Sequence, residues 1–475
     1  MSEMESRDGR RWWALALIAT AQFMVIMDTS IIGVALPRMQ TDLGFSQGNL
    51  SWVFNAYVIA FGGLLLLGGR LSDLLGAKRV FAAGWVVLLA GSVVAGAADQ
   101  VWLELTGRAV QGVGAALIAP SALTLLMMLF GAKPKELTKA LALYGAAAPA
   151  GGTAGVFLGG VITEYLSWPW VFYLNIPIAL VVLAATPALM PGGVARRGGT
   201  DLTGAVTVTL GLAAAVYAIV RAPEAGWGST STIVGLTAAV VLLGAFLLLQ
   251  AKRRNPLVRL AIFRTPDLAA ANLAQLLLGA AWIPMWFFLN LYLQQVLGLG
   301  AFASGSALLP MTTVIMLLMI GVAPRLMARF GAKSMTVAGL AVLALGLGWL
   351  SLVRATGTFW IDVLPASLVA AAGMALAFIP SLGTAISSAR PEEGGLASGI
   401  VNTSYQVGSA LGLAAMTALA SSLGAGQTAD TAGLTDGLSA AFLGAAGIAV
   451  AGTVAAAMTL RQHRARQDEV EAVAA

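Results

Sequence analysis

Fourteen long apolar stretches constrain what this chain can fold into more than any other feature of the sequence. Each stretch provides the roughly 20 residues that a helix needs to cross the hydrocarbon core of a bilayer. Backbone groups find no hydrogen-bond partners in lipid, so such segments must be helical. The sequence therefore predicts an all-α polytopic membrane protein, with spans at 13–36, 51–69, 79–98, 103–130, 139–162, 170–190, 203–221, 232–250, 269–293, 303–323, 334–353, 361–386, 396–420 and 438–460.

The composition excludes several other classes of protein. Hydrophobic residues make up 59 % of the chain and charged residues only 10 %, against about 45–50 % and 25 % in soluble globular domains. Cysteine is absent, which excludes disulfides, thiolate metal sites and cysteine nucleophiles. His463 is the one histidine and lies in a polar tail without a second ligand nearby, so we expect no metal site. No nucleotide-binding loop or catalytic triad is evident, which predicts that the protein is not an enzyme.

The distribution of positive charge predicts the orientation of the spans. With the N-terminus inside, 23 of the 27 Lys and Arg residues fall in inside segments, whereas only Arg38, Arg221 and Arg354 fall outside and Arg108 lies within a span. Short cytoplasmic loops collect Lys and Arg in this way. We therefore expect an even number of spans in the cytoplasmic membrane, with both termini cytoplasmic and an uncleaved first helix. The net charge of +6 then sets topology and does not indicate a nucleic-acid partner.

One segment is repeated at long range. The sequence RLSDLLGAK at 70–78 recurs as RLMARFGAK at 325–333, each time after the second span of its half. A repeat of equal orientation implies two parallel six-helix bundles related by an axis along the membrane normal. The predicted parts are an N-terminal bundle at 1–200, two inserted helices at 201–252 and a C-terminal bundle with a cytoplasmic tail at 253–475.

Four segments carry a family resemblance: GRLSDLLGAKR at 69–79, MDTSIIGVALP at 27–37, LTGRAVQGVGAA at 105–116 and the glycine-rich residues 149–160. Together with the repeat, they resemble the fourteen-span drug:proton antiporter branch of the major facilitator superfamily over nearly the whole chain. The resemblance implies a major facilitator fold, alternating access, and export of a small amphiphilic substrate in exchange for protons. It implies no cofactor besides the proton gradient. We expect a lipid bilayer and no nucleic acid as partners, and a monomer is favoured.

The segment at 69–79 is similar to the family's gating motif between helices two and three. A glycine lets the chain turn tightly between two helix ends, and Asp73 is suited to pair with a basic neighbour or a helix N-terminus across the two halves. An ordinary basic loop that only sets topology is the alternative. The gating residues predicted from the motif are Gly69, Arg70, Asp73, Gly76, Lys78 and Arg79.

Asp28 and Arg108 are the predicted proton-coupling residues. A buried carboxyl group is costly, by about 2.5–3.5 kcal/mol on insertion scales, so it is a functional hypothesis by default. Such a group can hold a proton and release it when water or a cationic ligand arrives. Arg108 stays charged, and Asp28 is its natural partner. The alternatives are a structural acid bonded to Thr29 or Ser30 and an arginine that snorkels to the interface.

The fifth span resembles the signature of antiporters in this superfamily. Glycines four residues apart let another helix approach closely, and a proline offers a place to bend. Val156 and Ala142 depart from the signature, which has a proline and a glycine there, and a generic packing face is the alternative. The residues predicted for this role are Pro149, Gly151, Gly155, Gly159 and Gly160.

A substrate site of this kind is expected to be an apolar cavity near the midplane with few polar groups. Met and aromatic side chains adapt to varied shapes, although such residues also line lipid or core. The candidates are Gln22, Met24, Asn55, Tyr57, Gln111, Trp282, Trp286, Asn290, Tyr292 and Gln294. We treat the aromatic segment 168–177 as structural, and we leave Glu104 and Glu164 unassigned because they lie near predicted span ends.

Two other functions remain open at this stage. A proton-coupled symporter of a sugar or an organic acid would need several polar positions in its helices, and the sequence lacks them. A membrane sensor or scaffold that transports nothing has no reason to retain Asp28 and Arg108.

The predicted topology can be tested by labelling. Because the chain has no cysteine, single cysteines placed at residues 224 to 229 give a signal free of background. We expect them to react with a membrane-impermeant maleimide added outside intact cells, because these residues connect the two inserted helices on the outer side. Protection from outside, with reaction only after lysis, would contradict the predicted insertion.

Overall fold

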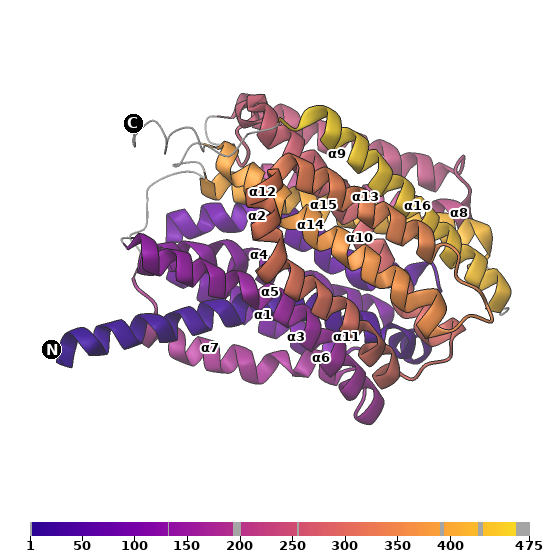
Figure 1. Cartoon of the computed structure of the whole chain (residues 1–475), viewed down its shortest axis with the longest axis horizontal. Coiled ribbons are helices and arrows are strands. Elements are labelled where there is room, and N and C mark those ends of the chain that lie inside the picture. The colour runs from indigo at the N-terminus through magenta and orange to yellow at the C-terminus, as the bar shows by residue number, and fades with distance from the viewer. Residues whose placement is uncertain are drawn as a thin grey trace.

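A computed structural model describes residues 2–131, 133–192, 201–253, 256–389, 394–425 and 431–461. Fourteen helices within these ranges are long and apolar enough to cross a membrane, which confirms the predicted number of spans. Figure 1 shows them as a bundle of roughly aligned helices. His463 and residues 193–200 lie outside the described residues.

The first six spans form the N-half, which comprises α1 (Ser2–Leu43), α2 (Trp52–Leu75), α3 (Ala77–Gly96), α4 (Val101–Phe130), α5 (Pro134–Tyr165), and the consecutive α6 (Trp170–Tyr173) and α7 (Asn175–Leu189). A single turn, η1 (Asn49–Ser51), precedes α2. Two further spans follow, α8 (Leu202–Ala225) and α9 (Thr230–Lys252).

The last six spans form the C-half. It comprises the turn η2 (Leu260–Arg264), α10 (Pro266–Leu291) with η3 (Tyr292–Val296), α11 (Ala301–Leu317) with η4 (Leu318–Val322) and α12 (Ala323–Phe330), α13 (Ala332–Leu350), η5 (Phe359–Val363) with α14 (Leu364–Ser388), α15 (Gly394–Ala420) with η7 (Ser421–Ala425), and α16 (Thr431–Thr459).

Glycines allow one corresponding helix pair in each half to pack closely. In the N-half, a Cβ on Gly151 or Gly155 would collide with the α1 backbone at Phe23 or Met27, and Gly159 meets Ile31. The partners advance together by four residues, as they must where two helices run parallel. The C-half repeats this arrangement, because Gly408 and Gly412 of α15 lie against the α10 backbone at Leu276 and Ala280. The same packing therefore recurs in both halves.

The repeated segment forms the same sharp turn in both halves. Gly76 connects α2 to α3 with φ 90° and ψ 132°, and Gly331 connects α12 to α13 with φ 82° and ψ 158°. Each glycine donates its backbone N–H to the carbonyl four residues earlier, Ser72 in one half and Met327 in the other. Only glycine adopts such positive φ values without strain. The turn is much shorter than the predicted loop at 69–79, because its first residues belong to α2 and its last to α3.

The two halves contact each other through α2 with α15 and through α5 with α11. Four hydrogen bonds link them around η3, at what we call the Gln295 end of the bundle. Gln295 Nε2 donates to Gln40 Oε1 at 2.6 Å, and Gln47 Nε2 donates to Gln295 Oε1 at 3.2 Å. Gln294 donates to the Val34 carbonyl at 2.8 Å, and the Phe302 N–H points at Glu164 at 3.5 Å. The halves are thus held together at the Gln295 end in this state.

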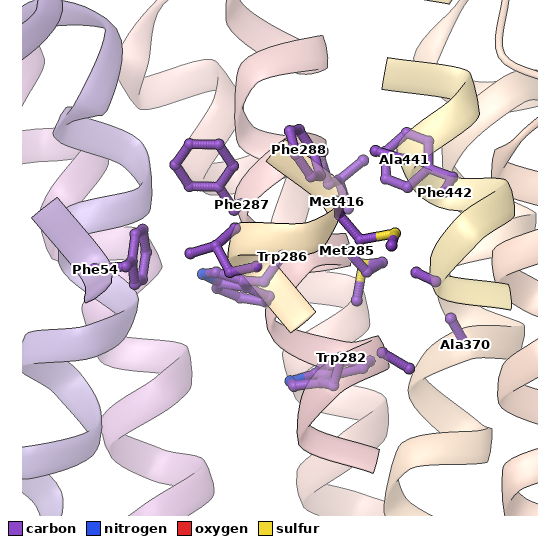
Figure 2. Packing of buried hydrophobic residues seen from close by; sticks show 14 of the residues in the cluster. Phe54, Trp282, Met285, Trp286, Phe287, Phe288, Ala370, Met416, Ala441 and Phe442 are labelled. Carbon is purple, nitrogen blue, oxygen red and sulfur yellow. The ribbon is translucent and has the colours of Figure 1, made fainter. Parts of the chain in front are cut away.

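Aromatic packing also joins the halves. Phe54 of α2 meets Phe287 of α10 edge to face, with ring centroids 5.9 Å apart. Figure 2 shows Phe54 on its own helix, facing the group of Trp282, Trp286, Phe287 and Phe288 on the other side. An edge-to-face pair of this kind is worth about 0.5–1.5 kcal/mol beyond the area that it buries.

The two middle helices pack on each other, and α8 also packs on α2 and α15. Asp201 holds this hairpin at its base: it caps α8 at the Gly204 N–H and forms an ion pair with Arg253 at 2.8 Å. Gln250 donates to Asp201 at 2.7 Å and accepts from the Val258 N–H at 3.0 Å. The helices at 202–252 are therefore tied to the start of the C-half, and the exact domain boundaries stay a prediction.

Several predicted span ends were wrong, and two of them concern arginines that were expected in outer loops. The first span was expected to end at residue 36, but α1 continues through Pro37 and Arg38 to Leu43. It does so because polar residues at its end make contacts, such as Asp42 accepting a hydrogen bond from the Trp168 indole at 2.9 Å. Arg221, expected in an outer loop, lies in the last turns of α8.

The two turn glycines are expected to be equally sensitive to substitution. Gly76→Ala and Gly331→Ala each force a side chain into positive φ, so we expect each to lower the free energy of unfolding by about 1–3 kcal/mol. Gly348→Ala is the matched control, because its Cβ would meet nothing within 4 Å in a regular helix. Unfolding of the purified protein in detergent measures all three. A loss in the control as large as in the turn variants would contradict this explanation.

Candidate functional site

An ion pair between Asp28 of α1 and Arg108 of α4 lies at the centre of the N-half. The Arg108 Nη1 to Asp28 Oδ2 distance is 2.5 Å, and the two side chains are 0 % and 2 % exposed. Removing one partner of such a pair leaves an uncompensated buried charge and typically costs about 3–5 kcal/mol. The structure brings together the two residues that the sequence paired, so Arg108 does not snorkel.

Three uncharged polar side chains complete this group, which we call the Asp28 cluster: Asp28, Ser92, Arg108, Gln111 and Asn175. Gln111 donates to Asp28 at 3.2 Å and accepts from Arg108 at 2.8 Å. Asn175 donates to Asp28 at 3.1 Å. Gln111 and Asn175 also donate to the Ser92 hydroxyl, at 2.9 and 3.1 Å. The cluster draws one member or more from each of α1, α3, α4 and α7, so it joins four helices.

Arg108 is held in one orientation by its other contacts. Its Nε donates to the Val53 carbonyl at 3.0 Å, and its guanidinium lies over the Tyr57 ring at 4.6 Å and near the Phe172 ring at 6.0 Å. Arginine suits this role, because its planar fork bonds in several directions and stacks on aromatic rings. Its Nη2 has no hydrogen-bond partner among the described residues.

Glycines of the α4 motif allow the neighbouring helices to approach the cluster. A Cβ on Gly107 would collide with Ala95 of α3, and one on Gly112 would collide with the Tyr57 carbonyl of α2. Gly91 of α3 lies in turn against the backbone N–H of Gln111. These small residues bring three helices close enough for short polar side chains to meet.

A second buried acid, Glu104, lies in α4, one turn before Arg108. Its side chain is 0 % exposed, and neither carboxyl oxygen has a hydrogen-bond partner among the described residues. It lies in the first helical turn, where the dipole favours a negative charge by at most about 2 kcal/mol. Desolvation of an unpaired ion costs several kcal/mol, so burial outweighs the dipole and favours the neutral acid.

The predicted substrate residues do not form one group. Gln111 belongs to the Asp28 cluster, and Gln22 accepts a hydrogen bond from Tyr144 at 2.9 Å. Tyr292 and Gln294 lie at the Gln295 end, where the Tyr292 hydroxyl donates to the Arg354 carbonyl at 2.8 Å. Gly33 of α1 faces Trp286 and Asn290. The remaining candidates, Met24, Asn55, Tyr57 and Trp282, are buried.

Buried amide groups without partners stand out among these candidates. Both polar atoms of the Asn55 side chain, and the Asn290 Oδ1, have no hydrogen-bond partner among the described residues. A buried amide group that makes no hydrogen bond is costly. Asn55 and Asn290 are therefore the candidates with free capacity to bond a ligand.

The predicted gating residues lie on both sides of the Gly76 turn. Arg70 and Asp73 lie in the last turns of α2, and Asp73 is exposed without an ion pair in the part of the chain that the structure describes. Lys78 donates to the Pro187 carbonyl at 2.8 Å, at the end of α7. Arg79 is exposed, and Gly69 lies in α2. The predicted contact of Asp73 across the halves is not formed in this state.

The glycines of α5 serve two neighbours. Gly151, Gly155 and Gly159 pack on α1 as described, whereas Gly160 faces the backbone of Ala301 and Phe302 in the other half. Val156, at the position where a proline was expected, lies against Gly305 of α11. This helix therefore connects the Asp28-bearing helix to the C-half.

Ser92, Asn175 and Glu104 were not among the predicted site residues. Asn175 lies within the segment 168–177 that we treated as structural, and Glu104 was left unassigned because it lies near a predicted span end. A sequence signal for each exists: Ser92 and Asn175 are polar residues in or beside apolar spans, and Glu104 lies four residues before Arg108 on the same helix face.

Comparisons with known proteins agree with this architecture. A family model described as the Major Facilitator Superfamily matches residues 18–413 and 326–475. The chain is 39 % identical over 423 residues to the cephamycin export protein CmcT of Amycolatopsis lactamdurans, which covers 88 % of this chain and 87 % of that protein. It is 36 % identical over 429 residues to the puromycin resistance protein pur8 of Streptomyces alboniger, which covers 89 % and 84 %.

A solved structure of the POT family transporter PepTSo superimposes with a TM-score of 0.69. It covers 95 % of this chain and 97 % of that one at 16 % identity, so the likeness concerns the fold alone.

A double-mutant cycle tests the coupling in the Asp28 cluster. Asp28→Asn and Arg108→Gln should each destabilise the protein. The double variant should lose less than the sum of the two by about 0.5–3 kcal/mol, since neither charge is then left without the other. Unfolding in detergent gives the three free energies. Additive losses would show that the two side chains do not interact energetically.

Proposed function

Because the chain belongs to the major facilitator superfamily, we propose that it is a proton-coupled antiporter that exports amphiphilic drugs or antibiotics. It acts in the cytoplasmic membrane by alternating access, with both termini cytoplasmic. Membership in this family makes it a multi-pass membrane transport protein and not an enzyme. Export as the direction follows from the relatives, which are named for cephamycin export and puromycin resistance.

The observation that carries the proposal is the buried pair of Asp28 and Arg108. A proton that crosses the bilayer in exchange for drug must be bound by a group within the spans, and Arg108 cannot release one. Asp28 can, and it is surrounded by donors that stabilise its ionised form. Protonation of Asp28 would weaken these hydrogen bonds and thereby the packing of α1 against α4 and α7.

A proton gradient can supply the energy for such export. One elementary charge moving through about 100 mV yields roughly 2.3 kcal/mol. Few other means of energising transport are compatible with a chain that carries no nucleotide-binding motif. The proton gradient is therefore the proposed driving force, and no cofactor is proposed.

Alternating access has a concrete meaning in this geometry. The four hydrogen bonds at the Gln295 end close what we propose is the outer side. Release of substrate to the outside then requires these contacts to break. The turn at Gly76 lies at the opposite end, and we propose that Asp73 pairs across the halves when that inner end closes.

The proposed substrate site lies where the halves meet. Phe54, Trp286 and Phe287 offer aromatic surface, while Asn55 offers a free amide group and Asn290 a free amide oxygen. An apolar surface with few polar groups suits an amphiphile. A hydroxylated solute such as a sugar would need more hydrogen-bond partners than these residues offer.

Transport in inverted membrane vesicles tests the proposal. With a proton gradient imposed, wild-type vesicles should accumulate puromycin or the dye ethidium, and collapse of the gradient should abolish uptake. Asp28→Asn removes titration but keeps size, so gradient-driven accumulation should fall at least tenfold. Asp28→Glu retains the carboxyl and should keep part of the activity with a shifted pH optimum.

The matched control is Asp99→Asn, since Asp99 is an exposed acid in the connection between α3 and α4. It should transport like the wild type. Normal accumulation in Asp28→Asn would leave Asp28 as a structural acid. The absence of gradient-driven uptake for all probes in the wild type would favour a sensor or scaffold.

A further inference from the structure

Among the residues of the N-half that the structure describes, two acids but one arginine are buried. We propose that Glu104 is a second proton-binding residue, so that Asp28 and Glu104 share the charge of Arg108 and the site retains one exchangeable proton, on Glu104 in this state. Only the role of this second proton site in transport rests on the proposed function. Its structural content concerns this chain whether or not drug is exported.

The geometry places Glu104 beside the Asp28 cluster but outside its hydrogen bonds. Four residues separate it from Arg108, so the two side chains lie on one face of α4, about 6 Å apart along the axis. Neither carboxyl oxygen of Glu104 has a partner among the described residues, and neither has the Arg108 Nη2. An unused hydrogen-bond donor of Arg108 and unused acceptors of Glu104 therefore lie on the same helix, α4.

The charges around Glu104 fix the protonation of the site. Arg108 on α4 and Asp28 on α1 are the charged groups that act on Glu104. Among the described residues of the helices packed on α4, the other charged side chains toward the end where Glu104 lies are Arg38 and Asp42 of α1 and Glu164 of α5. Arg38 is exposed, Asp42 accepts a hydrogen bond from the Trp168 indole, and Glu164 accepts one from the Phe302 N–H. Tyr57 of α2 contributes a buried hydroxyl, and α3 contributes Ser92.

Counting these charges gives the proton number. Two ionised carboxyl groups beside one guanidinium would leave a net negative charge in a buried site, which is strongly unfavourable. With one proton bound, the site is neutral. In this state Asp28 has the 2.5 Å contact to Arg108 and donors from Gln111 and Asn175, whereas Glu104 has none. Asp28 is thus the ionised acid and Glu104 the protonated one.

The arrangement also defines an exchange between the two acids. When the Glu104 O–H bond breaks, its electron pair stays on the carboxylate, which then accepts a hydrogen bond from Arg108 Nη2. The proton is taken up by a carboxylate oxygen of Asp28, which releases Arg108. The number of bound protons stays at one, and the acid paired with arginine changes. Such a site could present its proton from two levels of the membrane.

Infrared difference spectroscopy of the purified protein in detergent tests this without any substrate. At neutral pH, the wild type should show the carbonyl band of a protonated, buried carboxylic acid, which shifts on exchange into D₂O. Glu104→Gln should lose this band and bind one proton fewer per molecule in a potentiometric titration. Glu104→Asp should keep a band at a shifted position, and it serves as a second variant if the glutamine protein does not fold.

Two further variants separate the possible results. Glu224→Gln removes an exposed acid of α8 and should leave the band unchanged. In Asp28→Asn, Glu104 is the one remaining partner for Arg108, so it should ionise and the band should again be lost. A band that persists in Glu104→Gln and disappears only in Asp28→Asn would overturn the proposal. Failure of drug transport with these spectra intact would refute the proposed function and leave the second proton site standing.

Discussion

The absence of hydrogen-bond partners in lipid is the constraint on which this structure depends. It forces the chain into helices. It also means that every buried charge must find its partners within the protein, because lipid offers none. Asp28 and Arg108 meet this demand together, with Gln111 and Asn175 completing the bonds of the carboxylate. Four helices are thereby joined through one polar group, so the part that handles charge is also the part that organises the N-half.

Small residues make that group possible. Polar side chains as short as Ser92 and Asn175 meet in the Asp28 cluster because glycines at 91, 107 and 112 remove the side chains that would keep the helices apart. Close packing of backbones replaces the hydrophobic driving force that soluble proteins use between helices. Close glycine packing and buried charge therefore go together in the N-half. In the part of the C-half that the structure describes, the packing recurs without a fully buried ion pair like that of Asp28 and Arg108.

Much of the fold could be predicted from the sequence, because crossing a bilayer leaves a strong and nearly one-dimensional signal. The number of spans and the pairing of Asp28 with Arg108 follow from that signal and from the motifs. The role of Glu104 did not, since burial near a helix end depends on how neighbouring helices cover it. Asn175 escaped for a related reason: adjacent aromatic residues indicated an interface, and only the packing of α7 brings it to Asp28.

The register between α1 and α5 determines how motion reaches the charges. Gly151, Gly155 and Gly159 lock onto Phe23, Met27 and Ile31 one turn after another, so neither helix can slide along the other without steric collision. One residue further, Gly160 abuts the backbone of the opposite half. A displacement of the C-half at Gly160 would therefore move α5 and α1 together as a rigid unit. Asp28, on α1, would shift with them without any rearrangement of the side chains between Gly160 and Asp28.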